Sequence, residues 1–458
     1  MEARSVHLVG IGGSGMSAIA RILLARGATV TGSEMTRSPL VERLEREGAR
    51  IAIGHAGENV GDVDRVVASS AIRADNPERI AARERGIPVL SRGTMLAELI
   101  GDRPCIAVAG THGKTTTTAM LAIVLERGGL DPTVAVGGER VDTQTNARDG
   151  AGTWFLTESD ESDGSFLELR PTLAVITNIE NDHVADDRAM ERLVSQFDRF
   201  LATIPAHGFV AISVDNPRSA ALARRTKTTR VGTFGIDAPA DIVATGVRFE
   251  GLGSAFGVAC RGSMLGSCTL GVPGAINIQN ALAAIAVARE AGVPFETIAA
   301  ALADFRGVRR RFDILARTEA MTVVDDYAHH PTAVAETIAA ARAVSAGPLI
   351  VAFQPHRYTR TAYLATDFAR ALAGADEIYL TPIYAAAESP IEGIDERSIG
   401  EPLAASGSIV RYAAVDDLPA LLQANVPRGA LVLMLGAGSI THRAHDLAAR
   451  VAPAAALA

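Results

Sequence analysis

The sequence predicts an α/β protein of three domains. Short β-branched runs such as VHLVG and ATVTGS enclose Ala/Leu-rich segments of helical pattern such as SAIARILLARG, and this alternation is typical of a parallel sheet. Glycine-rich loops follow predicted strands at two distant points, near Gly10 and near Gly110, which indicates two separate phosphate-binding units. With 458 residues the chain is long enough for two or three domains.

We expect each domain to begin where a new strand opens. The first, residues 1–103, is predicted to be Rossmann-like and ends in the helical pattern TMLAELIG. The second, residues 104–309, opens with the strand CIAVAG and is predicted to hold a P-loop ATPase-like sheet, with short strands at 241–272. The third, residues 310–458, is predicted to be Rossmann-like, with strands in MTVVDDYAHHP, LIVAFQP, EIYLTPI and ALVLMLGAG.

Composition argues against several classes of function. A net charge of −8 disfavours nucleic acid as a partner, because its phosphates require a basic face. The three cysteines form no CxxC pair, which is typical of a reducing compartment. The chain shows no signal-peptide pattern and no apolar run of about 18 residues, so we expect a cytoplasmic protein with no membrane partner.

The segment GTHGKT at residues 110–115 stands between a predicted strand and a predicted helix. Backbone N–H groups at such a helix start, together with a lysine ammonium, can hold polyphosphate, and the following hydroxyl can bind Mg²⁺. Of 44 basic residues only Lys114 and Lys227 are lysines. The loop is shorter than the generic G-x-x-x-x-G-K-[ST] pattern, and a plain strand-to-helix turn is the alternative. We predict an ATP-binding loop.

A second glycine loop, GIGGSG at residues 10–15, follows the strand VHLV and precedes a helix, and Glu34 comes just after the next strand. This pattern predicts a diphosphate bound at a helix N-terminus. By itself it does not distinguish NAD or FAD from another nucleotide diphosphate.

The acidic motif TESDESDGSF contains Glu158, Asp160, Glu161 and Asp163, and the following strand segment, LAVITNIENDH, ends in His183. Carboxylate oxygens and an imidazole at adjacent strand ends can hold Mg²⁺ beside the γ-phosphate of ATP. The alternative interpretation is a solvated acidic loop that binds no metal. We favour the metal site because the motif follows a predicted phosphate loop.

Asn277 and Asn280 lie three residues apart at a predicted helix start, so that both amides can project from one face. Helix capping would explain one of them equally well.

In the third domain, DDYAHHP and QPHRYTR each follow a predicted strand, and open α/β sheets bind ligands at that end of their strands. Basic side chains in these two segments predict a cationic pocket suited to a carboxylate. They are His329, His330, His356, Arg357 and Arg360. For His330, which precedes Pro331, a purely structural role is the alternative.

These motifs, in this order and over essentially the whole chain, resemble those of the Mur ligase family: GIGGSGMSAIA, SSAI, GTHGKTTTTAM, ESDESDGSF, TNIENDH, INIQNA, RRFD, DDYAHHPT and FQPHRYTRT. The resemblance implies a first domain that binds the diphosphate of a UDP-sugar, a central ATPase domain and a mobile C-terminal domain that brings in the amino acid. It therefore favours a UDP-sugar over NAD at the first glycine loop. After His183 the chain reads VADDRAME, where relatives usually carry a slightly longer segment.

Matched residue by residue, the resemblance implies a set of site residues in each domain. For the UDP-sugar these are Gly12, Gly13, Ser14, Gly15, Ser33, Ser69 and Ser70. For ATP they are Gly110, Thr111, His112, Gly113, Lys114, Thr115, Thr116, Asn277, Asn280, Arg311 and Asp326. The implied catalytic residues are Lys114, Glu158, His183 and Asp326, and the implied Mg²⁺ ligands are Thr115, Glu158 and His183. The implied amino-acid pocket consists of His329, His356, Arg357 and Arg360.

The resemblance implies an enzyme that uses ATP and Mg²⁺ to join L-alanine to the lactyl carboxylate of UDP-N-acetylmuramate through an acyl phosphate, in peptidoglycan precursor synthesis. FQPHRYTR favours addition of single alanine over the tripeptide-recycling branch of the family. Two rivals come from other classes: an NAD-dependent dehydrogenase, which would not need Lys114, and a nucleotide-binding regulator without turnover. We expect a monomer or a dimer.

The lysine content adds one expectation. Family members that act later in the pathway generally carry a lysine, shortly after the metal histidine, whose amine is carboxylated to give an extra metal ligand. This chain has no lysine between Lys114 and Lys227. We therefore predict that no lysine carbamate takes part in the reaction.

Overall fold

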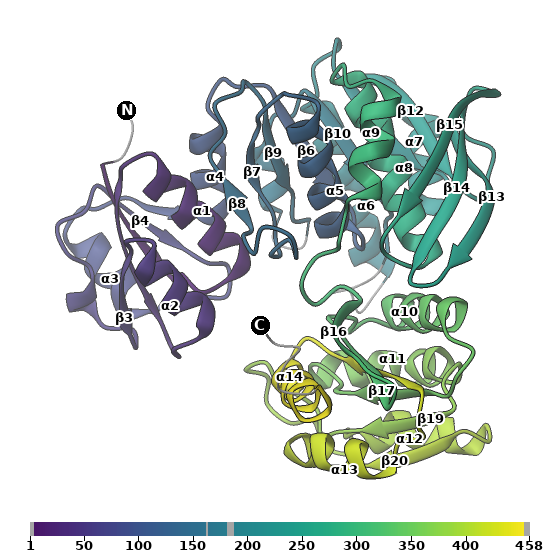
Figure 1. Cartoon of the computed structure of the whole chain (residues 1–458). Helices are drawn as coiled ribbons and strands as arrows, with labels where there is room; N and C mark the ends of the chain where they lie inside the picture. Colours follow the sequence, from purple (N-terminus) through teal and green to yellow (C-terminus); the bar gives the residue numbers. More distant parts are fainter. Residues whose placement is uncertain (1–3, 162–163, 181–186, 453–458) are drawn as a thin grey trace.

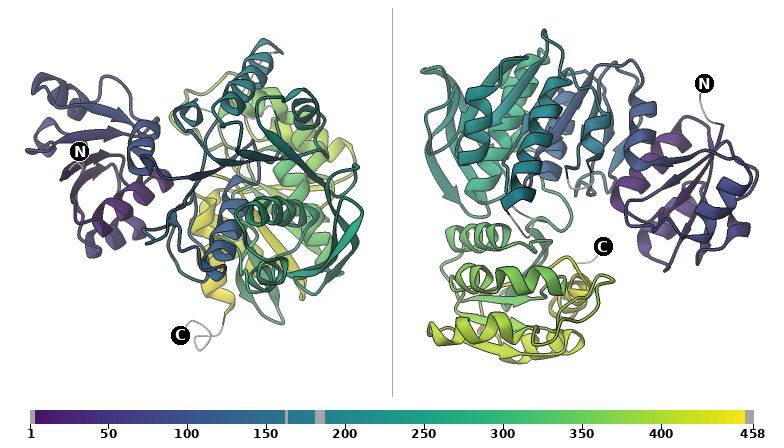
Figure 2. Two further views of the ribbon diagram at one scale, coloured as in Figure 1. Left: turned by 90° about the horizontal axis from the view of Figure 1, so that it is seen from above. Right: turned by 180° about the vertical axis from the view of Figure 1, so that it is seen from behind.

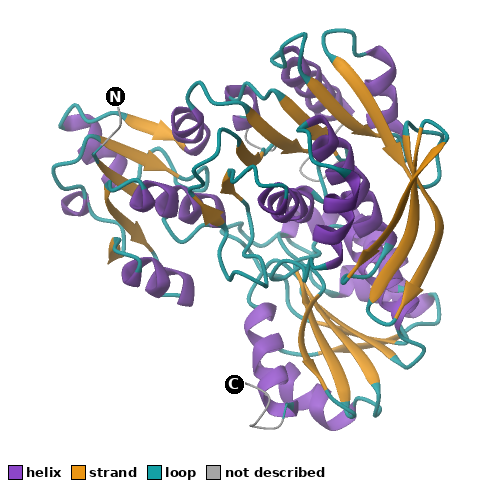
Figure 3. Ribbon diagram, turned by 45° about the horizontal axis from the view of Figure 1, so that its top comes forward, coloured by secondary structure: helices purple, strands orange, loops and turns teal. Residues whose placement is uncertain are grey.

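Three separate sheets follow one another along the chain, in a computed structural model that describes residues 4–161, 164–180 and 187–452 (Figure 1). In the view of Figure 1 the N-terminal sheet lies to one side of the central sheet, and the C-terminal sheet lies below it. Figure 2 shows the same arrangement from above and from behind. Each of the three parts combines helices with strands, as Figure 3 shows. The predicted α/β class is confirmed.

The N-terminal sheet has five parallel strands in the order β3-β2-β1-β4-β5. Its strands are β1 (Ser5–Val9), β2 (Thr29–Glu34), β3 (Arg50–Ile53), β4 (Arg65–Ala68) and β5 (Val89–Ser91). Its helices are α1 (Ser14–Ala25), α2 (Pro39–Arg46), the short 3₁₀ helix η1 (Gly57–Asn59), α3 (Pro77–Glu84) and α4 (Arg92–Ile100). The strand order reverses at β1, and open parallel sheets bind ligands beside such a point.

Two of these helices begin at clear sequence signals. Ser38 caps α2, because its side chain accepts a hydrogen bond from the N–H of Val41. Asn76 caps α3 in the same way through the N–H of Glu78. A proline follows each cap at the first position of the helix. A backbone N–H at that position has no partner within the helix, so proline loses no hydrogen bond there.

The central sheet has ten strands in the order β15-β14-β13-β12-β11-β10-β6-β9-β7-β8. Its strands are β6 (Cys105–Ala109), β7 (Thr133–Ala135), β8 (Ala147–Arg148), β9 (Phe155–Glu158), β10 (Leu173–Ile176), β11 (Phe209–Ser213), β12 (Arg230–Gly235), β13 (Ile242–Glu250), β14 (Gly253–Cys260) and β15 (Ser263–Leu270). Its helices are α5 (Lys114–Arg127), the 3₁₀ helix η2 (Ser165–Glu168), α6 (Asp187–Ala202), α7 (Pro217–Arg225), α8 (Ala275–Glu290) and α9 (Phe295–Ala303). The strands expected at 241–272 form the antiparallel edge β13–β15.

One hydrophobic cluster runs from the N-terminal sheet into the central sheet. It contains Leu8 of β1 together with Ala107 of β6 and Phe155 of β9. At its border Arg26 forms an ion pair with Asp149, with 2.9 Å between nitrogen and oxygen. The two units are therefore joined by shared apolar packing, which is the dominant stabilising term in a fold, as well as by the chain itself.

The C-terminal sheet has six strands in the order β16-β17-β21-β18-β19-β20, and only β16 runs antiparallel to its neighbour. Its strands are β16 (Asp313–Arg317), β17 (Met321–Asp326), β18 (Leu349–Phe353), β19 (Glu377–Leu380), β20 (Ile409–Tyr412) and β21 (Ala430–Leu435). Its helices are α10 (Pro331–Val344), α11 (Tyr358–Leu372), α12 (Arg397–Ala405), the 3₁₀ helix η3 (Val415–Asp417), α13 (Leu418–Asn425) and α14 (Ile440–Val451). Helices on both faces bury the sheet in two apolar clusters.

Among the residues that the structure describes, none of the helices combines the length and the apolar character needed to cross a bilayer. The three cysteines are free thiols, and burial raises the pKa of Cys105 and of Cys268 to about 12.

Candidate active site

The phosphate loop follows β6, which lies between β9 and β10 in the central sheet. Its glycines are required by their surroundings. Gly110 has a φ of 128°, and a Cβ atom there would lie 2.1 Å from Oγ1 of Thr177. Gly113 has a φ of 83°, and a Cβ atom would lie 2.5 Å from Oδ1 of Asn280. Any side chain at either position would collide with a polar group of the site and strain the backbone.

Residues at the end of β10 hold this loop in shape. The N–H of His112 donates to Oδ1 of Asn178 at 2.8 Å, and its carbonyl oxygen accepts from Oγ1 of Thr177 at 2.6 Å. The N–H of Glu180 donates to Oγ1 of Thr111 at 2.8 Å. Because parallel strands end at one edge of the sheet, the loop and the TNIE segment lie together although they are far apart in sequence.

Lys114 begins α5, and its side chain turns back over the loop. Its Nζ atom donates to the carbonyl oxygen of Gly110 at 2.6 Å and lies 2.8 Å from Oε2 of Glu161. Burial disfavours the ammonium, but the carboxylates of Glu161, Asp160 and Glu158 outweigh it and raise the pKa of Lys114. The lysine is therefore a cation at neutral pH, placed where a polyphosphate would meet it.

Thr115 and Glu158 face each other across this edge of the sheet. The Thr115 hydroxyl donates to Oε2 of Glu158 at 2.8 Å. The Glu158 carboxylate lies against the backbone of Gly137, where a Cβ atom would approach Oε1 to 1.7 Å. A hydroxyl and a carboxylate are the oxygen donors that Mg²⁺ prefers, so this pair fits the expected ion. The third expected ligand, His183, lies outside the described residues.

The two asparagines at the start of α8 turn toward neighbouring polar groups. The Nδ2 atom of Asn277 donates to the carbonyl oxygen of Pro273 at 2.7 Å. The Oδ1 atom of Asn280 accepts from Oγ1 of Thr117 in α5 at 3.1 Å. The capping residue of α8 is Gly274, which makes no side-chain bond. Neither asparagine caps the helix.

A cavity of about 320 Å³ lies between the central and the C-terminal sheets. Several of the expected ATP-binding residues line it: His112, Gly113, Thr115, Thr116, Asn277, Asn280, Arg311 and Asp326. Its wall also contains residues that the sequence did not single out, among them Asp215, Asn216, Gln279, Thr332 and Glu336. Asp215 and Asn216 follow β11, whereas Gln279 lies within α8 and Glu336 within α10. Nothing in the sequence alone shows that these residues approach the phosphate loop.

Asp326 ends β17 at the wall of this cavity. Its carboxylate accepts hydrogen bonds from the N–H groups of Phe312 and Ala328, each at 2.7 Å. Burial raises the pKa of Asp326 to about 6, although Arg311 and these two N–H groups act in the opposite direction. The guanidinium of Arg311 lies over the Tyr327 ring, 5.0 Å from its centroid. Asp326 therefore ties the segment that carries Arg311 to the end of β17.

The first glycine loop lies at the carboxyl ends of β1 and β2. The N–H of Gly12 donates to Oε2 of Glu34 at 2.9 Å, and Gly13 stands at the N-terminus of α1. The Ser33 hydroxyl donates to Oε2 of the buried Glu78 at 2.6 Å. Ser14 and Gly15 begin α1, and Ser69 and Ser70 follow β4 at the same edge of the sheet.

Arg92 is a residue that sequence reasoning missed. It begins α4, and its guanidinium approaches Gly15, where a Cβ atom would lie 3.0 Å from Nη1. Its Nη2 atom lies 3.5 Å from Oδ2 of Asp160 and 3.4 Å from Oγ of Ser165. Arg92 thus stands between the first glycine loop and the acidic motif. Its only sequence signal is its place at the carboxyl end of a short strand.

Three of the four residues expected to hold the amino acid lie together after β17 and β18. The rings of His329 and His356 are 5.8 Å apart, and Nη1 of Arg360 lies 3.2 Å from Nδ1 of His356. Tyr384, which the sequence did not indicate, stacks on His356 at 5.6 Å. Arg357 is exposed and has a φ of 72°, and its N–H donates to the carbonyl oxygen of Tyr384.

Family models match the chain along its length. The model described as Mur ligase family, catalytic domain, matches residues 5–103, the Mur ligase middle domain matches 108–288, and the Mur ligase glutamate ligase domain matches 310–438. The chain belongs to the Mur ligase family. This assignment excludes the dehydrogenase that the first glycine loop alone allowed.

Individual Mur ligases resemble the chain over nearly its full length. The UDP-N-acetylmuramate–L-alanine ligase of Dinoroseobacter shibae is 45% identical over 450 residues, which cover 97% of each chain. The enzyme of the same name from Acidithiobacillus ferrooxidans is 47% identical and covers 95% of this chain and 96% of its own.

Solved structures of Mur ligases have the same architecture. The UDP-N-acetylmuramate–alanine ligase of Thermotoga maritima superposes with a TM-score of 0.85 at 30% identity, covering 98% of this chain and 99% of its own. The murein peptide ligase of Psychrobacter arcticus superposes with a TM-score of 0.73 at 25% identity, with the same coverage.

Proposed function

We propose that this Mur ligase joins L-alanine to the lactyl carboxylate of UDP-N-acetylmuramate at the expense of ATP, as a step of peptidoglycan precursor synthesis. The cavity between the central and C-terminal sheets carries the proposal, because the phosphate loop lines one wall and Arg311 and Asp326 line the other. Relatives named for this reaction match 95–97% of the chain at 45–47% identity. They favour single alanine over the peptide of the murein peptide ligase, which is 25% identical.

A carboxylate does not condense with an amine in water at a useful rate, so it must first become a better electrophile. Attack of the lactyl carboxylate on the γ-phosphorus of ATP gives an acyl phosphate and releases ADP. In this step Lys114 exchanges Glu161 for phosphoryl oxygens and neutralises their charge. Mg²⁺, for which Thr115, Glu158 and His183 are the proposed ligands, supplies further charge neutralisation at the phosphates.

The C-terminal cluster is proposed to position the amino acid. A guanidinium fork such as that of Arg360 binds a carboxylate in two parallel hydrogen bonds, and His329, His356 and Arg357 complete the cationic setting. The neutral amine of L-alanine then attacks the acyl carbon. A tetrahedral intermediate forms, phosphate leaves with the bonding electron pair and takes up the proton that the amine loses, and an amide remains.

The UDP-sugar is proposed to bind along the first glycine loop, with its diphosphate at the N-terminus of α1. Gly12, Gly13, Ser14 and Gly15 supply the backbone there, and Ser33, Ser69 and Ser70 lie at the same edge of the sheet. Arg92 supports this placement, because it lies between the loop and the acidic motif that faces the ATP site.

We further propose domain bounds of 1–103, 104–309 and 310–458. Each range contains one of the three sheets, β1–β5, β6–β15 and β16–β21. A cytoplasmic monomer or dimer is proposed, which agrees with the free cysteines.

Phosphate release tests the reaction directly. We expect release from ATP and Mg²⁺ only when both UDP-N-acetylmuramate and L-alanine are present, and little release when a tripeptide replaces L-alanine. Full turnover with ATP alone would contradict the ligase. Preference for the tripeptide would instead support the recycling branch.

A further inference from the structure

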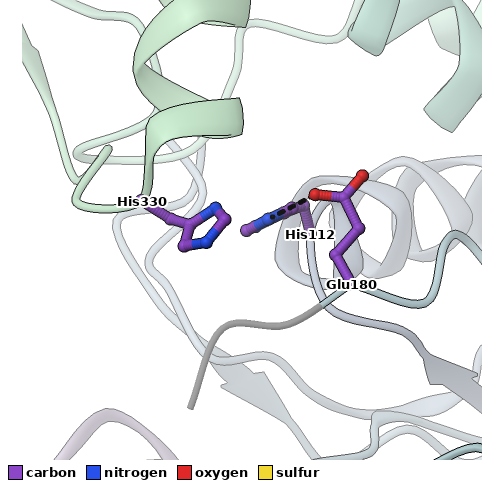
Figure 4. Close-up of side chains that lie close together, drawn as sticks. All are labelled: His112, Glu180 and His330. Atoms are coloured by element: carbon purple, nitrogen blue, oxygen red, sulfur yellow. Dashed lines mark ion pairs between the residues drawn. The ribbon is translucent and has the colours of Figure 1, made fainter. Parts of the chain in front are cut away.

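Two histidines and a glutamate meet where the phosphate loop touches the C-terminal sheet (Figure 4). His112 belongs to the loop after β6, Glu180 follows β10, and His330 immediately precedes α10. The Nε2 atom of His112 lies 3.5 Å from Oε2 of Glu180, and the rings of His112 and His330 are 5.2 Å apart. One ligand atom from each of the three residues lies within 4.8 Å of the other two.

The backbone fixes two of these residues before any ligand arrives. The N–H of His112 is bonded to Asn178, and the N–H of Glu180 is bonded to Thr111, both at 2.8 Å. His330 is 7% exposed. The buried Nε2 atom of His112 faces Oε2 of Glu180 at 3.5 Å, and within the described part of the chain it makes no closer hydrogen bond. An ion between these two atoms would take both of them as ligands. Ligands held in this way lose little freedom on binding.

The spacing suits a four-coordinate ion. Zn–N and Zn–O bonds of about 2.0–2.2 Å place two ligands of a tetrahedral site about 3.3–3.5 Å apart. His112 and Glu180 already have this separation, at 3.5 Å. His330 needs a side-chain shift on the order of 1 Å to complete a three-ligand site with one open position.

The donor types distinguish this cluster from the proposed Mg²⁺ site. Mg²⁺ prefers oxygen ligands in an octahedron, and two of its three proposed ligands, Thr115 and Glu158, supply oxygen, while His183 is the one imidazole among them. Two imidazoles with one carboxylate favour a borderline transition ion, of which Zn²⁺ is the one that adapts to a tetrahedral set. An ion here would also connect two parts of the molecule, because His330 belongs to the C-terminal unit and the other two ligands to the central sheet.

We propose that His112, Glu180 and His330 form a Zn²⁺ site, separate from the Mg²⁺ site of the reaction, and that the bound ion fastens the C-terminal unit to the phosphate loop. Opening between these two parts then requires that a metal ligand be released. Bound Zn²⁺ therefore restricts opening of the ATP cavity.

Zn²⁺ titration of the full-length chain tests the site without substrates. The protein is stripped of metal with EDTA, dialysed and titrated by calorimetry in the absence of nucleotide, since ATP itself binds Zn²⁺. We expect one Zn²⁺ per chain, and affinity lower by at least about tenfold in His330→Gln and in Glu180→Gln. The matched control is His207→Gln, which removes an exposed histidine of the central unit and should leave the affinity unchanged. Co²⁺ should give visible absorption of four-coordinate strength in the wild type and in His207→Gln, but not in His330→Gln or Glu180→Gln.

Hydrogen exchange tests the fastening. Zn²⁺ should slow exchange in the first turn of α10, and Glu180→Gln should abolish the effect although Glu180 belongs to the other sheet. Should His330→Gln fail to fold, Glu180→Gln decides alone. Absence of stoichiometric binding, or equal affinity in wild type and Glu180→Gln, overturns the site. Loss of affinity in His207→Gln shows adventitious surface binding and overturns it as well. Because no substrate is present, these results do not depend on the proposed ligase reaction.

Discussion

The Nζ atom of Lys114 lies 2.8 Å from Oε2 of Glu161 and 2.6 Å from the carbonyl oxygen of Gly110. The lysine is thus held over the phosphate loop by an internal carboxylate. A polyphosphate bound at the loop, as proposed, would replace this carboxylate with stronger negative charge at the same place, so the ammonium would not have to move in from solvent. Pre-positioned charge of this kind is the main source of catalysis in phosphoryl transfer.

Lys114→Ala is expected to lower kcat by at least about 100-fold, equivalent to roughly 3 kcal/mol or more, because it removes charge that matters most in the transition state. Phosphate release at saturating substrates measures it. Lys227→Ala is the matched control, since it removes the only other lysine, which is exposed. Near-normal turnover in Lys114→Ala would remove this lysine from the mechanism.

Arg360→Lys is expected to raise the KM for L-alanine on the order of tenfold, because an ammonium cannot reproduce the two parallel hydrogen bonds of a guanidinium. Arg360 is only 6% exposed, and its guanidinium lies beside His356. An exposed arginine elsewhere could take over its role only if the side chains around this position repacked. Initial rates at varied L-alanine measure the effect. Arg370→Lys, an exposed change on the same helix, should leave KM unchanged. An unchanged KM in Arg360→Lys would show that the carboxylate binds elsewhere.

Glu78 of α3 is a fully buried carboxylate beside β1 and β2. Ser33 and Asn59 each donate to it at 2.6 Å, and His7 and His55 lie 3.5 Å away. Burial opposes its ionisation, but the nearby His7 side chain and the hydrogen bonds from Ser33 and Asn59 outweigh burial and lower the pKa of Glu78 to about 2. The ionised carboxylate therefore stabilises the folded protein.

Because the folded pKa of Glu78 lies below the ordinary value of 4.5, its stabilisation is complete above that pH and is lost as the pH falls toward about 2. Glu78→Gln is expected to lower the free energy of unfolding on the order of 3 kcal/mol at pH 7. The difference from wild type should shrink on acidification. Urea unfolding at several pH values measures it, with the exposed Glu84→Gln on the same helix as control. A difference that does not vary with pH would contradict the ionised assignment.

Activity is expected to be unaffected when CO₂ and bicarbonate are rigorously removed. Lys114 is paired with Glu161 and Lys227 is exposed, so neither is placed to carry a carbamate that binds metal. The intact mass should show no labile increment of one CO₂. A loss of activity that bicarbonate restores would demonstrate a carbamate.

The phosphate loop, the first glycine loop and the order of the motifs could be read from the sequence, because each depends on a few consecutive residues and on the backbone they allow. Alternating strand and helix patterns predicted the α/β class for the same reason. The asparagine pair was ambiguous, since one spacing serves both a helix cap and a ligand face. Only the packing of α8 against α5 showed that Asn280 meets Thr117.

Contacts between distant segments were decided by tertiary structure alone. Arg92 and Ser165 are 73 residues apart, and no local pattern at either position encodes their approach. The burial of Glu78, the stacking of Tyr384 on His356 and the meeting of His112 with His330 arise in the same way. The sequence by itself determined which chemical groups are present and at which strand ends they stand. Which of them touch depends on how the three sheets pack, because side-chain contact requires complementary surfaces that only the assembled fold brings together.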